Sequence, residues 1–582
     1  MKKTLPIGID SFREIRETDR YYIDKTLFIR DFIQTYDEVS LITRPRRFGK
    51  TLNITMLMEF FDITTDSKAI FEGLDIMGTK YANQINSRPV IYYTFKDCKA
   101  NNVKTLLFII GDVILSEYRK YAKIFKGNVK ELSDDYLTFF MIYEKLIKRE
   151  IDIEFLMISI ITLEQAVYEY YKIKPILLID EYDQPILSSF ENGYHDQLKD
   201  FFAGFYGAAL KGQYCLHQAL LTGIQRIVKE SIFSQLNNIV VYTVLDKCYS
   251  SYFGLTSGET EELLASYGMV LDEAVKQKYD GYLFGEVEIY NPWSLLNYAK
   301  SGELRNYWIN TSTNYLIKKS INEADELFRK YFEKLISDGA AKIAANLECS
   351  FIELKSRYTL WGLLINSGYL TVIGQADGIY MNVRIPNGEV QSEFAGIVAD
   401  QANVQGEGLH EMFRCLFEQK MDAFLEIYSE LVISCTSYFD AKENAYHMLF
   451  LGMCISLNNL YKITSNIESG FGRSDIIMES LSIDRPHIII EFKQGGAASG
   501  AVEGGAAGEG GEVGAASEPG VASGAVEDDV AGKIDKLDVL KEAALRQILD
   551  KRYYSNLHGD ILCVGIAHNK KKCCIAHQVL KN

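Results

Sequence analysis

The chain has 582 residues, of which 47% are hydrophobic and 24% are charged, an ordinary composition for globular domains. This length exceeds what one hydrophobic core serves, so we expect about three domains. The formal net charge of -16 excludes a protein that coats nucleic acid non-specifically, and any contact with DNA must come from local basic patches.

The ten cysteines are scattered and form no C-x-x-C pair, which indicates a reducing compartment and unpaired thiols. The first ten residues lack the continuous apolar stretch of a secretory signal. No apolar run approaches the roughly 18–20 residues that cross a membrane. We therefore expect a cytoplasmic protein without a membrane contact.

Short apolar strands alternate with helical patterns over the first 244 residues. Strands are expected at residues 39–43, 89–95, 175–180 and 216–222, because these runs are short, apolar and rich in β-branched and aromatic side chains. Strands that alternate with helices predict an α/β domain with a parallel sheet covered by helices on both faces.

The segment Arg44-Pro-Arg-Arg-Phe-Gly-Lys-Thr51 joins the first of these strands to a helix with apolar spacing over residues 52–62. It ends in Gly49, Lys50 and Thr51, the part of a P-loop that contacts phosphate and magnesium. Backbone N–H groups and the positive helix end would hold an anion, Lys50 would reach the outer phosphates, and the Thr51 hydroxyl would ligate Mg²⁺. The segment predicts a nucleotide site.

Three arginines distinguish this loop, and one of them, Arg44, replaces the first glycine of the P-loop motif. Arg44, Arg46 and Arg47 are candidates to supply charge that glycine amides supply elsewhere, because a guanidinium suits bidentate phosphate contact. A solvated basic loop, or a contact to DNA, explains them equally well.

The third strand ends in Asp180 and Glu181, as expected of a buried strand that delivers carboxylates to the sheet edge. Asp180 is expected to hold Mg²⁺, directly or through water, and Glu181 to polarise the water that attacks the γ-phosphate. The alternative is a core strand followed by a solvated acidic turn. At the end of the fourth strand, Thr222 is a candidate γ-phosphate sensor and Arg226 a candidate arginine finger. A structural hydroxyl and a surface arginine explain these two at least as well.

Residues 245–400 change to helices with short strands, and residues 360–372 predict a helix followed by a wing-like strand. We interpret this region as a helical or winged-helix-like lid. Residues 401–582 combine amphipathic helices with strands near residues 475–478, 487–493 and 560–566, and a helix over residues 534–554.

Residues 495–532 contain 12 glycines, 10 alanines, seven acidic residues and no basic residue. This segment has too few large apolar side chains to offset chain entropy, so we expect a disordered insertion. A linker between domains is the alternative. We favour an insertion within one domain, because Lys493 before it and Gln547 after it are expected to serve one site.

A second candidate catalytic site is formed by Asp475, Glu491 and Lys493. Glu491 and Lys493 share a strand face because side chains alternate, and Asp475 on a neighbouring strand can converge with them. Two carboxylates bind one or two Mg²⁺, which lowers the pKa of bound water, and Lys493 would orient that water.

Three residues outside these strands are candidates to support the same site. Glu443 precedes it on a helix and offers a further carboxylate, while Gln547 and Tyr553 follow it on another helix and would contact the DNA backbone or the water. Surface positions explain Glu443 and Gln547 equally well, and exposed charges on a half-buried strand are the alternative for the whole constellation.

Further short segments complete a pattern along most of the chain. They are Leu5-Pro-Ile-Gly-Ile, Phe12-Arg-Glu-Ile, Tyr22-Ile-Asp-Lys-Thr, Asp180-Glu-Tyr-Asp, Tyr279-Asp-Gly-Tyr, Tyr290-Asn-Pro-Trp, Tyr307-Trp-Ile-Asn, Ile385-Pro-Asn, Glu389-Val, Tyr446-His, Gly472-Arg-Ser-Asp and Glu491-Phe-Lys. Together they resemble bacterial AAA-ATPase-like proteins with a C-terminal PD-(D/E)XK nuclease-superfamily domain. Arg44 in the P-loop is usual in that family, whereas the insertion directly after Lys493 departs from it.

The resemblance implies a P-loop NTPase domain at residues 1–244, the lid at residues 245–400 and a restriction-endonuclease-like α/β domain at residues 401–582. It implies ATP and Mg²⁺ as cofactors and DNA as a partner, with Asp475, Glu491 and Lys493 as the nuclease centre. We therefore expect an ATPase coupled to a metal-dependent DNA nuclease. The alternative is a signalling-type NTPase switch whose C-terminal domain binds nucleic acid or a protein without cleavage. A pure interaction scaffold is a third reading, and a homo-oligomer is compatible with each of them.

Overall fold

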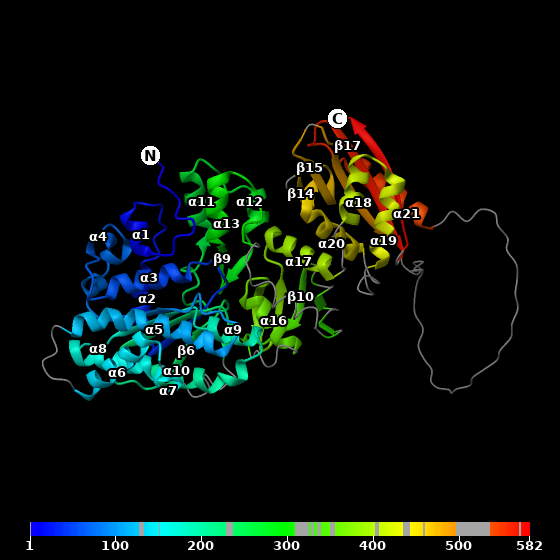
Figure 1. Cartoon of the computed structure of the whole chain (residues 1–582). Coiled ribbons are helices and arrows are strands. Elements are labelled where there is room, and N and C mark those ends of the chain that lie inside the picture. Colours follow the sequence, from blue (N-terminus) through cyan, green and yellow to red (C-terminus); the bar gives the residue numbers. More distant parts are fainter. Residues whose placement is uncertain are drawn as a thin grey trace, which may run out of the picture. The chain divides into compact units, whose positions relative to one another are not determined.

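The structure is a computed structural model, and the chain divides into two compact units, Met1–Glu393 and Phe394–Asn582 (Figure 1). The structure describes residues 2–126, 133–150, 152–227, 237–308, 325, 327–328, 331–332, 335, 339–349, 356–401, 407–434, 443–457, 460–482, 484–495, 536–569 and 572–581. The predicted insertion, apart from Gly495, lies outside these residues. The division of the first unit into two domains stays a prediction.

The first unit is built on a five-stranded sheet in which every pairing is parallel, in the order β2-β3-β4-β1-β6. The four predicted strands are confirmed, and the edge strand β6 was not foreseen. The bounds are β1 (Val39–Thr43), β2 (Val90–Thr94), β3 (Ile176–Asp180), β4 (Gln218–Gly223) and β6 (Ile239–Tyr242). Because β4 lies between β1 and β3, the carboxyl ends of all three strands meet at one edge.

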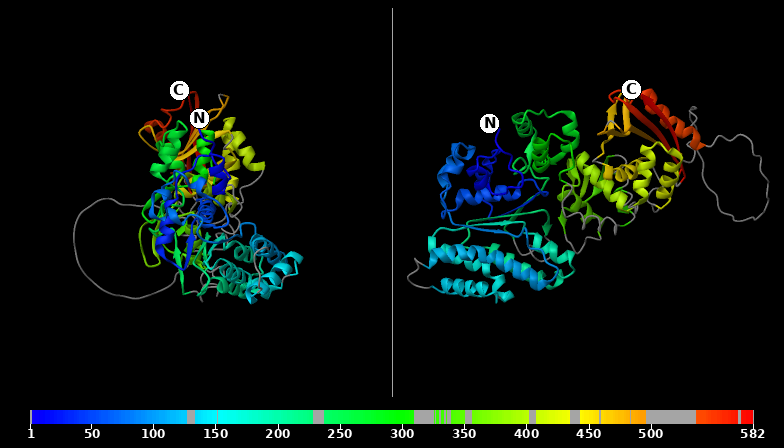
Figure 2. Two further views of the ribbon diagram at one scale, coloured as in Figure 1. Left: turned by 90° about the vertical axis from the view of Figure 1, so that its left-hand side faces the viewer. Right: turned by 45° about the horizontal axis from the view of Figure 1, so that its top comes forward.

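Both faces of this sheet are covered, since β1, β3 and β4 are buried along their whole length. Alternate residues, such as Leu41 and Leu177, pack in one core with α5 (Val103–Phe125), α6 (Asp134–Lys148), α8 (Ser159–Tyr171) and α10 (Lys199–Leu210). Helix α3 (Lys50–Phe61) lies on the opposite face (Figure 2). Continuous burial of short β-rich runs explains why the sequence predicted these strands well.

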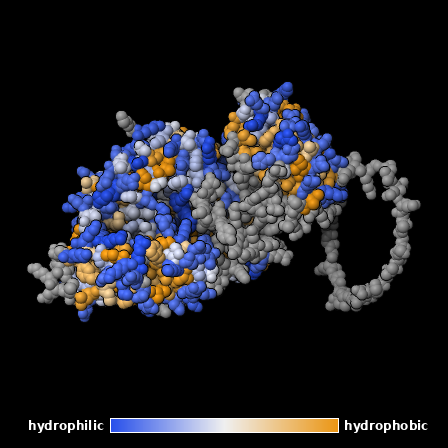
Figure 3. Space-filling view, viewed as in Figure 1, coloured by the Kyte–Doolittle hydropathy of each residue, from blue (hydrophilic) through white to orange (hydrophobic). Residues whose placement is uncertain are grey.

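Smaller elements complete this part of the unit. They are α1 (Phe12–Glu17), α2 (Leu27–Thr35), α4 (Lys68–Phe71), α7 (Ile153–Met157) and α9 (Gln184–Glu191). Hydrophobic side chains gather on the lower part of the unit in Figure 3, where Figure 1 draws α5 to α8 and α10. Phe108, Leu137 and Met141 are exposed there. Exposed apolar groups of this kind do not by themselves identify a partner, so the homo-oligomer stays a prediction.

The remainder of the first unit contains two small antiparallel sheets. One has the order β7-β9-β8 and is flanked by helices, and the other has the order β10-β13-β12. Among the described residues there is also a short parallel pair, β5 with β11. In the β10-β13-β12 sheet, α16 (Arg357–Asn366) is followed by the hairpin of β12 (Thr371–Asp377) and β13 (Tyr380–Arg384), so the predicted helix and wing are confirmed. The other bounds are β5 (Arg226–Ile227), β7 (Leu255–Thr256), α11 (Ser257–Ser266), α12 (Glu273–Tyr279), β8 (Tyr282–Phe284), β9 (Val287–Tyr290), α13 (Pro292–Ser301), β10 (Ala340–Ala344), β11 (Glu348–Cys349) and α17 (Gly388–Gln401).

The second unit is a mixed sheet in the order β14-β15-β16-β17-β18, with helices packed on it. Only β16 and β17 pair in parallel, and α21 is the crossover between them. The bounds are α18 (Glu407–Phe417), α19 (Met421–Ser434), α20 (Glu443–Met453), β14 (Tyr461–Ser469), β15 (Gly472–Ser480), β16 (His487–Gln494), α21 (Lys536–Lys551), β17 (Asp560–Asn569) and β18 (Lys572–Lys581). The expected strands and final helix are confirmed, whereas β14 and β18 were not foreseen.

Helix α21 approaches the sheet closely at Gly565 in β17. A Cβ added at this glycine would lie 2.5 Å from the backbone N of Leu545 and 2.5 Å from the backbone O of Lys541. Any larger residue would push the helix away, so glycine determines the height of α21 above β16 and β17. Among the described residues, no helix is long and apolar enough to span a membrane.

Candidate functional sites

The P-loop connects β1 to α3, and Gly49 caps the helix with a φ of +85°, a conformation that glycine adopts without strain. The Lys50 ammonium lies inside the curve of the loop, where it donates to the carbonyls of Arg44 (3.0 Å) and Pro45 (2.9 Å). Burial lowers the pKa of Lys50, and the nearby charges of Glu181 and Asp180 act in the opposite direction. The loop therefore holds a cation at the positive end of a helix.

Asp180 at the end of β3 is the centre of the hydroxyl contacts at this edge. The Thr51 hydroxyl donates to its Oδ2 at 2.7 Å, and the Thr222 hydroxyl donates to its Oδ1 at 2.6 Å. Burial raises the pKa of Asp180, while the two hydroxyls lower it. The structure thus brings together Thr51, Asp180 and Thr222, which lie on three different strands or helices.

The turn after β3 holds Glu181 in a left-handed conformation, with a φ of +52°. Such a conformation is uncommon for a residue with a side chain. The turn is held by Asp183, whose Oδ2 accepts from the backbone N–H groups of Ile224 (2.8 Å) and Gln225 (2.9 Å). Sequence reasoning had assigned no role to Asp183. Its only signal was its place in the Asp-Glu-Tyr-Asp segment.

The three loop arginines have different surroundings. Arg44 is fully buried, donates to the carbonyls of Thr43 (2.8 Å) and Tyr242 (3.1 Å), and lies against the rings of Phe253 and Phe284. Burial lowers its pKa to about 10. This interior position does not favour a phosphate contact, and a role of Arg44 in phosphate binding stays a prediction.

Arg46 and Arg47 lie nearer the surface. The Arg47 guanidinium lies 3.9 Å from the ring centre of Trp293. Arg46 lies close enough to Lys50 for its charge to lower the lysine pKa, so it is the stronger candidate for a phosphate contact. Arg226 lies on β5, which pairs with β11, and its role as an arginine finger stays a prediction.

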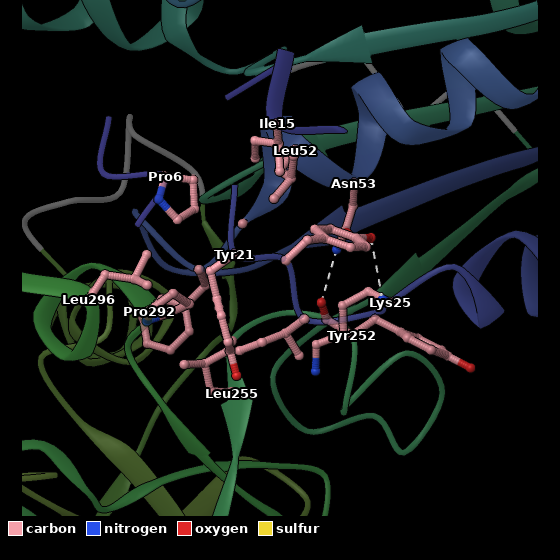
Figure 4. A pocket seen from close by; sticks show the side chains of 15 residues that line it. Pro6, Ile15, Tyr21, Lys25, Leu52, Asn53, Tyr252, Leu255, Pro292 and Leu296 are labelled. Carbon is pink, nitrogen blue, oxygen red and sulfur yellow. Dashed lines mark hydrogen bonds between the residues drawn. The ribbon is translucent and has the colours of Figure 1, made fainter. Parts of the chain in front are cut away.

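A largely apolar pocket of about 90 Å³ lies beside the start of α3. Figure 4 shows Tyr21, Pro292 and Leu296 on one side and Asn53 and Lys25 on the other. The pocket joins the N-terminal segment, the P-loop, the chain near Leu255 and the start of α13. Sequence reasoning missed it, because its walls come from segments far apart in the chain.

Lys25 is the cationic group of this pocket. Its Nζ contacts both carboxylate oxygens of Glu259 (2.6 and 2.7 Å) and the carbonyl of Ser251 (2.6 Å). Burial lowers the pKa of Lys25, and Glu259 raises it. The ion pair therefore ties the N-terminal segment to α11 at one wall of the pocket.

In the second unit, β15 and β16 place the predicted carboxylates side by side. The Asp475 Oδ2 accepts from the backbone N–H of Phe492 at 2.8 Å, and the Glu491 Oε2 accepts from the backbone N–H of Asp475 at 3.3 Å. The Lys493 Nζ lies 3.4 Å from the Glu491 Oε1. The three predicted residues therefore converge, each held partly by the neighbouring strand.

Helix α21 adds a fourth residue, because Gln547 donates from its amide to the Glu491 Oε1 and also lies 3.2 Å from the Tyr553 hydroxyl. Helix α20 begins at Glu443, whose side chain lies outside the described set. The His447 Nε2 lies 3.1 Å from the backbone O of Asp475. Sequence reasoning gave His447 no role, although the Tyr-His segment was noticed.

The ionised forms of Asp475 and Glu491 are electrostatically unfavourable so close together. Burial and the charge of Asp475 raise the pKa of Glu491 to about 8, and burial raises that of Asp475. The buried Glu491 and the half-buried Asp475 beside one lysine fit a divalent cation, which would balance their charge. No group of three or more His, Cys, Asp and Glu side chains placed for a metal exists among the described residues, so the fit rests on this pair.

The two sites define a P-loop NTPase-type domain followed by a nuclease-type domain. Residues 6–233 match a family model described as a predicted AAA-ATPase, and residues 441–507 match the PD-(D/E)XK nuclease superfamily. The chain thus contains an AAA-ATPase-like domain and, towards its C-terminus, a PD-(D/E)XK nuclease-superfamily domain. It is also 28% identical over 403 residues to an uncharacterized protein in the vnfD 5' region of Azotobacter chroococcum mcd 1, covering 67% of this chain and 69% of that protein.

Proposed function

We propose that this protein hydrolyses ATP at the P-loop and cleaves nucleic acid at Asp475, Glu491 and Lys493, with nucleotide turnover controlling cleavage. The observation that carries the nuclease assignment is the convergence of the buried Glu491, the half-buried Asp475, Lys493 and Gln547. The ATPase assignment rests on the contacts of Thr51 and Thr222 with Asp180 beside Lys50.

At the P-loop, Lys50 would exchange its loop carbonyls for the outer phosphates, and Arg46 would add charge beside it. Thr51 and Asp180 would hold Mg²⁺, which when bound neutralises phosphate charge. Glu181 would orient the attacking water, from a left-handed position in the turn directly after β3. Thr222 on β4 would change its hydrogen bond to Asp180 when the nucleotide state changes.

The pocket beside α3 is proposed to hold the nucleobase. It adjoins Gly49 and Leu52, so a base in it would stay connected to phosphates on the P-loop. Its apolar walls favour a flat heterocycle, and Lys25 offers a polar group at its edge. Nucleotide binding would therefore draw on the N-terminal segment, the chain near Leu255 and the start of α13.

At the second site, Asp475 and Glu491 would hold a divalent cation, which when bound lowers the pKa of water and neutralises the scissile phosphate. Lys493 would orient the attacking water and stabilise charge that develops on the phosphate. Gln547 would hold Glu491 in place, because its amide has no proton to lose and bonds the same carboxylate oxygen as Lys493.

Supercoiled plasmid incubated with Mg²⁺, with and without ATP, tests the nuclease. We expect cleavage by the natural chain and at least a hundredfold slower cleavage by Asp475→Ala and Lys493→Ala. Glu479→Gln is the matched control, because Glu479 lies on the same strand and pairs with Lys462 at the surface. Cleavage that survives Asp475→Ala would sink the assignment. Calorimetric titration with Mn²⁺ alone should show one site lost in Asp475→Ala.

Phosphate release from ATP tests the first site. Lys50→Ala and Glu181→Gln should each lower turnover at least about a hundredfold, whereas Lys68→Ala, an exposed lysine on α4, should not. A chain that hydrolyses ATP but neither binds a metal at Asp475 nor cuts DNA would favour the signalling-type switch. A chain that binds no nucleotide would favour a scaffold.

A further inference from the structure

The hairpin between β14 and β15 ends in a two-residue turn. Ser469 pairs with Gly472, so only Gly470 and Phe471 form the turn. Gly470 has a φ of +57°, which suits the first central position of a two-residue hairpin turn. The turn therefore presents one large side chain, Phe471, at its tip.

This turn is fixed to the end of α21. The Phe471 backbone N–H donates to the carbonyl of Lys551 at 2.7 Å, and the Ser469 hydroxyl donates to the carbonyl of Tyr553 at 2.7 Å. A Cβ on Gly470 would lie 2.2 Å from the Lys551 carbonyl and 2.3 Å from that of Arg552. The backbone of the tip is thus held on several sides.

The Phe471 residue is nevertheless 72% exposed. Single exposed apolar residues are common, but most do not sit on a turn that is anchored this closely. A rigid backbone that displays an aromatic ring to solvent loses little freedom when the ring is covered, which favours binding. The arrangement is suited to a contact with a flat partner.

The tip is also connected to the nuclease carboxylates. A Cβ on Gly472 would lie 3.3 Å from the Tyr553 hydroxyl, which is 3.2 Å from the Gln547 amide, and that amide bonds Glu491. Asp475 follows Gly472 by three residues on β15, a span of about 10 Å along a strand. Phe471 itself precedes Asp475 by four residues, about 13 Å along a strand, a distance that a few nucleotides span.

Two cationic residues have their backbone beside the tip. Lys551 and Arg552 are exposed, and the Lys551 Cδ would be 3.4 Å from a Cβ on Gly472. An aromatic ring beside cationic side chains is the combination that binds single-stranded nucleic acid, where bases stack on the ring and phosphates contact the cations. A base-paired duplex offers no free face to such a ring.

We propose that Phe471 is a stacking platform for an unpaired base next to the cleavage site, so that the preferred substrate is single-stranded or locally unpaired nucleic acid. This inference rests on the proposed nuclease function. The ring would hold the base while Lys551 and Arg552 contact the neighbouring phosphates, and Asp475 and Glu491 would lie at the phosphate to be cut.

Fluorescence anisotropy with labelled oligonucleotides, in EDTA so that no cleavage occurs, tests the inference on the full chain. Phe471→Ala should weaken binding of single-stranded DNA about tenfold and change duplex affinity less than twofold. Phe471→Trp should keep the single-strand affinity of the natural chain, because it keeps an aromatic ring at this position. Leu481→Ala is the matched control, because Leu481 is 62% exposed just beyond the opposite end of β15. Lys551→Ala should weaken single-strand and duplex binding alike and reduce the salt dependence. A single-stranded RNA of the same sequence shows whether the sugar matters.

Equal losses for single strand and duplex in Phe471→Ala, or no loss, would overturn the inference. A change in sedimentation of the free protein in that variant would also overturn it, since the ring would then contact a second copy of this chain. A failure of the proposed nuclease function can be distinguished from a failure of the stacking platform. If the natural chain binds single strands through Phe471 but Asp475→Ala does not alter cleavage, the stacking platform stands and the nuclease assignment falls.

Discussion

Replacing Glu164 by glutamine is expected to stabilise the first unit, and more strongly at pH 7 than at pH 5. Glu164 lies on α8 with no exposed surface, and among the described residues neither of its carboxylate oxygens has a hydrogen-bond partner. Burial raises the pKa of this carboxyl well above its usual value. Tyr93 and Cys215 face it, and both stay neutral in this pH range because burial raises their pKa values.

The size of the effect follows from proton linkage. Glutamate in an unfolded chain ionises near a pKa of about 4.3, whereas burial holds the pKa of Glu164 in the folded chain well above that value. A raised folded-state pKa contributes stability below the unfolded pKa, and this contribution is lost as the pH rises towards the folded pKa. Each pH unit in that window costs about 1.4 kcal/mol, so pH 5 to pH 7 amounts to about 2.7 kcal/mol. Glutamine buries a similar polar group that does not titrate. The substitution therefore removes the pH dependence of the unfolding free energy that Glu164 contributes.

Urea unfolding followed by tryptophan fluorescence measures the effect. All three tryptophans, Trp293, Trp308 and Trp361, belong to the first unit, so the signal reports its unfolding. The difference in unfolding free energy between Glu164→Gln and the natural chain should grow by about 2–3 kcal/mol from pH 5 to pH 7. Glu169→Gln is the matched control, because Glu169 lies on the same helix and pairs with Lys172 at the surface.

Parallel pH profiles for the natural chain and Glu164→Gln would refute the reasoning, because they would mean that Glu164 ionises in the folded state. Glu117, whose pKa burial raises to about 7, contributes a similar trend to both proteins and cancels in the difference.

Three further predictions follow from the contacts. Gly565→Val should displace α21 and separate Gln547 from Glu491, so Mn²⁺ affinity measured by calorimetry should fall about tenfold or more; unchanged affinity would mean that α21 does not position the site. Thr222→Val should keep ATP binding, measured with a fluorescent nucleotide, but slow hydrolysis about tenfold or more because Asp180 loses a donor; equal losses of binding and turnover would contradict this. Asp183→Ala should destabilise the first unit by about 2–5 kcal/mol in urea unfolding, since two buried N–H groups lose a charged acceptor; a loss below 1 kcal/mol would count against it.

Local patterns predicted which residues lie together at each of the two places. Gly49, Lys50 and Thr51 are adjacent in sequence, and the end of a buried strand places Asp180 beside them. Glu491 and Lys493 share a face because strand side chains alternate, which holds wherever the strand packs. The surroundings of Arg44 could not be predicted locally, because the rings beside it, Phe253 and Phe284, lie more than 200 residues further along the chain.

The sequence by itself determined which residues are available for phosphate and metal chemistry, since motif spacing and strand alternation are local properties of the chain. Only the tertiary structure decided how those residues are supported. Gly565 sets the position of α21 and so joins Gln547 to Glu491 across the insertion, and Lys551 holds the turn that exposes Phe471. The contacts of Gln547 with Glu491 and of Phe471 with Lys551 join segments about 50 to 80 residues apart. The physical reason they escaped sequence analysis is that close packing depends on the shape of both partners.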